Sequence, residues 1–96
     1  MSSTTDSRKA AQEHIRALIS MIEGLPHSEA RANLLEECEA LSRAIAAFHM
    51  EGIRFRSYNV DRLIQLGGES IPPGAQEVFA AMRKDLEAAG FHTRSH

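Results

Sequence analysis

Basic and aromatic side chains gather between residues 52 and 66, where they could hold a phosphate group. Three arginines and one aspartate give this segment a balance of +2, whereas the first 51 residues hold five Lys/Arg and eight Asp/Glu, a balance of −3. Guanidinium groups bind phosphate, and aromatic rings stack on the bases of single-stranded RNA. The sequence therefore predicts a candidate RNA- or anion-binding set, which consists of Arg54, Arg56, Arg62 and Tyr58.

The same arginines also have an interpretation without a ligand. They could be solvated, or they could pair with the acidic face of another helix in a partner subunit, formed by Glu36, Glu37 and Glu39. Both interpretations stay open at the level of the sequence.

A second candidate is His14, within the segment Glu13-His14-Ile15-Arg16-Ala17-Leu18. This segment resembles the phosphoacceptor segment of histidine-kinase dimerisation domains, which are helical hairpins with an exposed histidine on the first helix. The resemblance implies histidine phosphotransfer through His14. The segment departs from that family at two points. Ile15 stands where the family has an acidic residue, and the proline that interrupts the family's segment is absent. The alternative is an exposed helical histidine without a chemical role.

Other chemistry finds little support in the residue spacing. No two of the five histidines are three or four residues apart, which predicts no metal site. The only cysteine, Cys38, excludes an internal disulfide and is expected to be a buried hydrophobe without an activating partner. Gly67-Gly68 lacks the Lys-Ser/Thr that follows in a phosphate-binding loop. We therefore expect no cofactor and no enzymatic activity.

Three stretches place apolar residues at alternating steps of four and three, which predicts a buried stripe along each of three helices. The stripes are Ala11, Ile15, Leu18, Ile22 and Leu25; Leu34, Cys38, Leu41, Ile45 and Phe48; and Ala75, Phe79, Met82, Leu86 and Ala89. The predicted fold class is all-α. It consists of an antiparallel helical hairpin, a short helix and a C-terminal helix in a small bundle.

Helix-ending and helix-starting residues suggest the boundaries. The first helix should run from about 7 to Glu23, where Gly24 stops it, and Ser28 should cap the second. Because the stripe loses its phase at Gly52, we expect a kink or loop near this residue, and residues 52–59 could be either helix or an irregular turn. A short helix is predicted over 60–66, and a last one from Ala75 to Ala89, which Gly90 stops and onto which Phe91 folds back.

The expected organisation is one helical-bundle domain over residues 7–91, between a disordered tail at 1–6 and a flexible tail at 92–96. Further apolar residues flank the predicted stripes and widen them beyond what one short C-terminal helix could cover. This breadth predicts a homodimer in which two hairpins supply a four-helix core.

Composition narrows the function classes. The chain is 43% hydrophobic and 25% charged, as in ordinary globular proteins, and its net charge of −2 argues against non-specific binding to DNA or anionic membranes. No apolar run approaches the length of a membrane span, and polar residues 1–7 do not form a signal peptide, so we expect a cytoplasmic protein. The leading hypothesis is a non-enzymatic helical protein-protein interaction module. RNA or phosphate binding and histidine phosphotransfer are its alternatives.

Overall fold

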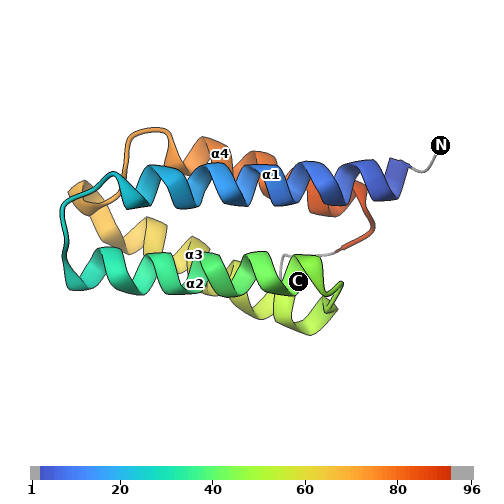
Figure 1. Ribbon diagram of the computed structural model, residues 1–96, viewed down its shortest axis with the longest axis horizontal. Helices are drawn as coiled ribbons and strands as arrows, with labels where there is room; N and C mark the ends of the chain where they lie inside the picture. Colours follow the sequence, from blue (N-terminus) through green and yellow to red (C-terminus); the bar gives the residue numbers. More distant parts are fainter. Residues whose placement is uncertain (1–2, 92–96) are drawn as a thin grey trace.

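A computed structural model describes residues 3–91, and their backbone is almost entirely helical. The elements are α1 (Ser3–Glu23), α2 (Glu29–Ala46), α3 (Met50–Gly67), the short 3₁₀ turn η1 (Gly68–Ser70) and α4 (Ala75–Ala88). The chain reverses direction between consecutive α-helices (Figure 1). Within this part of the chain there is no strand, so the predicted all-α bundle is confirmed.

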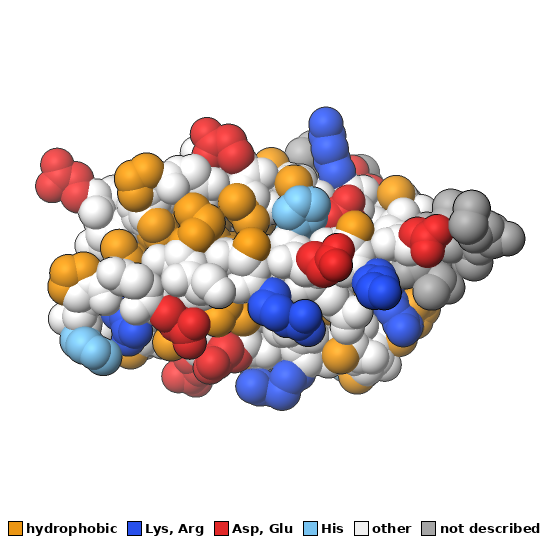
Figure 2. Space-filling view, turned by 45° about the horizontal axis from the view of Figure 1, so that its top comes forward, with side chains coloured by type: hydrophobic (Ala, Val, Ile, Leu, Met, Phe, Trp, Pro, Cys, Tyr) orange, Lys and Arg blue, Asp and Glu red, His pale blue; other side chains and the backbone are white. Residues whose placement is uncertain are grey.

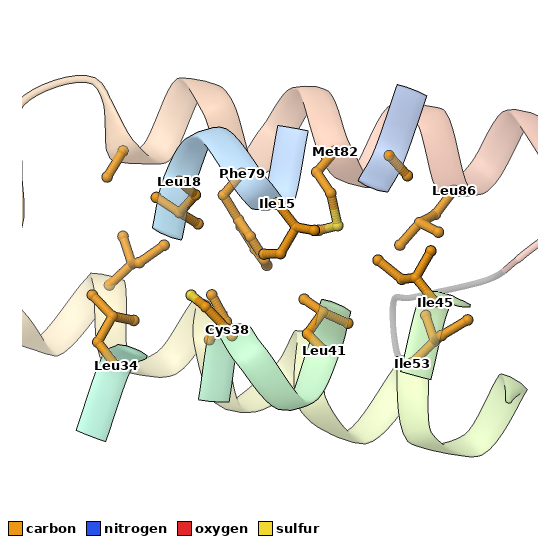
Figure 3. Packing of buried hydrophobic residues seen from close by; sticks show 14 of the residues in the cluster. Ile15, Leu18, Leu34, Cys38, Leu41, Ile45, Ile53, Phe79, Met82 and Leu86 are labelled. Atoms are coloured by element: carbon orange, nitrogen blue, oxygen red, sulfur yellow. The ribbon is translucent and has the colours of Figure 1, made fainter. Parts of the chain in front are cut away.

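The four helices form two packed pairs. Helix α1 lies along α4, α2 lies along α3, and α1 also contacts α2, whereas α3 and α4 barely touch. Apolar side chains from both pairs point toward one another between the layers (Figure 3). The buried side chains drawn there include Ile15, Leu18, Leu34, Leu41, Ile45, Phe79, Met82 and Leu86. The core therefore lies between the α1/α4 layer and the α2/α3 layer.

The predicted stripes form this core, except at two of their ends. Leu25 is only partly buried, and the side chain of Phe48 is 45% exposed. Both residues lie just beyond the end of a helix, where the helical periodicity no longer fixes the direction of the side chain. Phe91 is buried as expected, since its N–H reaches back to the carbonyl of Leu86 at 2.8 Å.

The break between the second and third helices is not where the sequence placed it. Helix α2 ends at Ala46 and α3 covers residues 50–67, so the break expected near Gly52 lies a few residues earlier, before Met50. The short helix predicted over 60–66 is the last part of this longer helix, so its predicted start is wrong. Phe48 adopts a left-handed φ of 60°, while the N–H groups of Phe48 and His49 donate to the carbonyls of Ile45 and Ala44. These two bonds form a Schellman motif, which ends α2 without a glycine.

Gly52 belongs to the start of α3 rather than to a break. The Nδ1 atom of His49 accepts a hydrogen bond from the backbone N–H of Gly52 at 2.9 Å and so caps the helix. A Cβ atom at position 52 would lie 2.6 Å from that nitrogen. The glycine is therefore needed to make room for the histidine cap.

Two other expectations change with the structure. Residues 3–6 belong to α1 rather than to a tail, because no glycine or proline interrupts the helix there and Asp6 favours its first turn. Residues 1–2 and the expected tail at 92–96 lie outside the described residues. The core positions of all four helices are already buried within one chain, so the physical reason for expecting a shared core in a homodimer no longer holds.

Candidate functional site

The predicted arginine cluster does not converge on one point. Residues two apart on an α-helix point about 160° away from each other, so Arg54 and Arg56 lie on different sides of α3. Arg56 turns toward α2, where its Nη1 donates to both carboxylate oxygens of Glu37 at 3.0 Å. Asn59 donates to the same carboxylate at 2.9 Å. Arg56 thus pairs with Glu37 of its own chain, and its charge is used to join α2 to α3.

Arg62 lies beside acidic side chains rather than beside Arg54. A groove of about 270 Å³ between α2 and α3 is lined by Asn33, Glu36, Glu37, Asn59, Arg62 and Leu63. The two glutamates make this groove a poor site for an anion such as phosphate. Arg54 is exposed on α3 eight residues before Arg62, so the two positions are about 80° apart around the helix axis, with Tyr58 between them. Arg54, Tyr58 and Arg62 therefore follow one ridge of α3 at steps of four, but Arg56 is paired with Glu37 on another side and Arg62 has glutamates beside it, so the four predicted residues do not form one phosphate site.

Tyr58 instead belongs to an apolar line on the outer face of α3. Phe55, Tyr58 and Leu66 are 57%, 58% and 72% exposed, although they are large hydrophobic residues. Their steps of three and eight keep them on one side of the helix, opposite the buried residues Ile53 and Val60. Sequence reasoning missed this face because it ended the helical periodicity at Gly52.

His14 forms the second site of interest. Its Nδ1 lies 2.5 Å from Oδ2 of Asp85, which ties α1 to α4, and the two side chains are 40% and 22% exposed. In Figure 2, in which the top of Figure 1 comes forward, acidic, basic and hydrophobic side chains lie interspersed on the visible surface. Because a carboxylate accepts, the proton of this hydrogen bond belongs to Nδ1, and in the neutral form of such a ring the lone pair is on Nε2.

The other described histidines have structural partners. The Nδ1 of His49 caps α3, and that of His27 lies 3.4 Å from the guanidinium group of Arg31. No cluster of three or more potential metal ligands occurs among residues 3–91. No described helix is long and apolar enough to cross a membrane.

Cys38 is fully buried, as the sequence predicts. Burial, together with the nearby negative charges of Glu37 and Glu39, raises the pKa of its thiol from 9.0 to about 12. A thiol in such surroundings stays protonated at neutral pH and is a poor nucleophile.

The comparisons do not assign the chain to a family. No model of a known protein family matches the sequence, and neither a curated protein nor a solved structure matches it at a significant level.

Proposed function

We propose that this protein is a non-enzymatic helical interaction module that binds a protein partner through the outer face of α3. The supporting observation is the exposed line of Phe55, Tyr58 and Leu66. Single exposed apolar residues are common, but a line of large ones along one helix is typical of an interaction surface. Tyrosine is also among the residues that contribute most to binding at interfaces.

The closed core strengthens this interpretation. Because the opposite face of α3 already packs on the rest of the bundle, folding does not need the outer face. The exposure of Phe55, Tyr58 and Leu66 lowers solubility and does not stabilise the fold. We therefore assign these side chains to binding. The partner could be a different protein or a second copy of the chain. In the second case the protein would still be a homodimer, as the sequence predicts, but the two chains would meet through this outer face and would not share a core.

A photo-crosslinking amino acid at position 58 tests the proposal. We expect Tyr58 replaced in this way to give a protein adduct in cells that express the chain, and we expect the adduct to disappear when Phe55→Glu is added. Arg16 is exposed on α1, far from this face, and the same replacement there is the matched control. Absence of an adduct at 58, or equal adducts at 58 and 16, would refute the proposal.

A second candidate function is phosphotransfer through His14, which the contact with Asp85 favours. The Nε2 lone pair would attack the phosphorus of an acyl phosphate, the P–O bond to the acyl group would break, and the carboxylate would leave. The proton on Nδ1 stays hydrogen-bonded to Asp85, which stabilises the positive ring as the N–P bond forms.

Acetyl phosphate is the probe for this second candidate. An acid-labile N-phosphoryl signal in ³¹P NMR is expected for the native chain, with loss in His14→Gln and slower formation in Asp85→Asn. His27 and His49 remain in both variants and are internal controls. A signal that survives His14→Gln would exclude His14 as the acceptor.

A further inference from the structure

Five exposed residues follow one line along the outer face of α3, and their order is informative. At about 100° per residue, the positions fall within roughly 80° of one another around the helix axis. They are Glu51, Phe55, Tyr58, Arg62 and Leu66. In the described part of the chain, neither Glu51 nor Arg62 has an ion pair or a side-chain hydrogen bond.

The first four of these residues form a self-complementary pattern. Read from either end, the line gives a charged residue, two aromatic residues and a charged residue of the opposite sign. If a second α3 lies antiparallel, with the twofold axis midway between Arg56 and Ser57, Phe55 meets the partner's Tyr58. Glu51 then meets the partner's Arg62. The twofold symmetry repeats each contact, which gives two aromatic pairs at the centre and two ion pairs outside them.

We propose that the partner on this face is a second copy of the chain, bound through an antiparallel α3–α3 interface with these four contacts. The inference rests on the proposed function, because it names the occupant of the same surface. Charge complementarity between Glu51 and Arg62 favours a second copy of the chain as the partner, and it favours the antiparallel orientation of the two α3 helices. A parallel pair would set Glu51 against the partner's Glu51 and Arg62 against the partner's Arg62, so that both contacts would be repulsive.

This dimer differs from the one expected from the sequence. The two bundles keep their own cores, and only the outer faces of α3 meet. One face of an 18-residue helix, about 27 Å long, makes an interface at the small end of specific protein contacts. The dimer should therefore be reversible, and it should dissociate on dilution rather than unfold.

Charge reversal tests both the occupant and the register. Glu51→Arg alone and Arg62→Glu alone each place like charges together at both ion-pair positions, so each variant should dimerise at least tenfold more weakly than the native chain. A 1:1 mixture of the two variants restores opposite charges at both positions and should dimerise with near-native strength. The double variant Glu51→Arg/Arg62→Glu should do the same.

Arg16→Glu is the matched control, since it makes the same change as Arg62→Glu at an exposed position of α1 rather than on the outer face of α3. We expect it to dimerise like the native chain. Circular dichroism establishes that every variant is folded, because these are exposed positions. Dimerisation is measured by sedimentation velocity from about 5 to 300 µM, the range in which small interfaces associate.

Each contrary result has a defined meaning. A native chain that is monomeric at the highest concentration overturns the homodimer, but the proposed function survives if the crosslinker at position 58 captures a different protein. Native-strength dimers of Arg62→Glu alone, or a mixture that stays monomeric, overturn the antiparallel register. If no adduct forms at position 58 either, both the inference and the proposed function fail.

Discussion

Truncation of Phe91 should be among the most destabilising single changes in the described chain. Its side chain is 2% exposed although it follows the last helix. The centroid of its ring lies 4.8 Å from the ring centroid of Phe48, in an edge-to-face arrangement. Phe→Ala changes in protein cores cost about 3–5 kcal/mol through lost burial and the cavity left behind. A chain of 96 residues has a total stability of about 5–14 kcal/mol. Phe91→Ala should therefore remove about a fifth or more of it.

Urea denaturation followed by circular dichroism measures this loss. With a typical slope for small proteins, the midpoint should fall by about 2 M urea while the slope stays unchanged. Phe55→Ala is the matched control, because it makes the same truncation at a side chain that is 57% exposed, and it should change stability by about 0.5 kcal/mol or less. Adding Phe48→Ala should reveal a coupling of about 0.5–1.5 kcal/mol with Phe91. Equal effects of Phe91→Ala and Phe55→Ala would refute the buried position of Phe91.

Three further changes follow from the core and its polar contacts. The hydroxyl of Ser57 is buried without a hydrogen-bond partner, so Ser57→Ala should raise the free energy of unfolding by about 1 kcal/mol in urea denaturation. Glu37→Ala removes the acceptor of Arg56 and should cost about 1–2 kcal/mol, whereas Glu36→Ala, at an exposed neighbour, should cost less than about 0.5 kcal/mol. The pKa of Cys38 is higher in the folded chain than the ordinary 9.0, so the unfolded thiol ionises first and stability falls as the pH rises from 9.0 toward 12. At about pH 10.5, the native chain should lose about 2 kcal/mol more than Cys38→Ala does relative to neutral pH, and equal losses would contradict the buried thiol.

Much of the fold follows from local patterns in the sequence. Steps of three and four placed the core positions of α1, α2 and α4, because a helix must bury its apolar stripe. Ser28 caps α2 by accepting from the N–H of Arg31, and Gly90 ends α4 with a φ of 97° that favours glycine. These signals depend only on residues close together in the chain.

The start of α3 could not be found in this way. Helices very commonly end in a left-handed glycine, but here Phe48 takes that conformation. Its ring lies against that of Phe91, which follows α4 and is distant in the sequence. Histidine is not among the usual N-cap residues, so His49 gave no signal. Glycine normally weakens a helix, but Gly52 leaves room for the His49 side chain that caps α3.

The candidate sites depend on contacts between distant segments. The pairing of arginines with acidic residues of the second helix was foreseen between two chains, but α2 and α3 are neighbours in one chain, so Arg56 reaches Glu37 directly. The contact of His14 with Asp85 joins residues 71 apart, and no local spacing announces it. The exposed line on α3 became visible only once residues 50–67 formed one helix.

A core that is complete within one chain leaves the outer face of α3 free for binding. Thermal unfolding of the double variant Phe55→Glu/Tyr58→Glu, at low and at high protein concentration, tests this claim most directly. We expect this variant to be a folded monomer with one cooperative transition and a Tm that does not depend on protein concentration. A variant that is unfolded, or whose Tm rises with concentration, would show that a second chain is needed to complete the core.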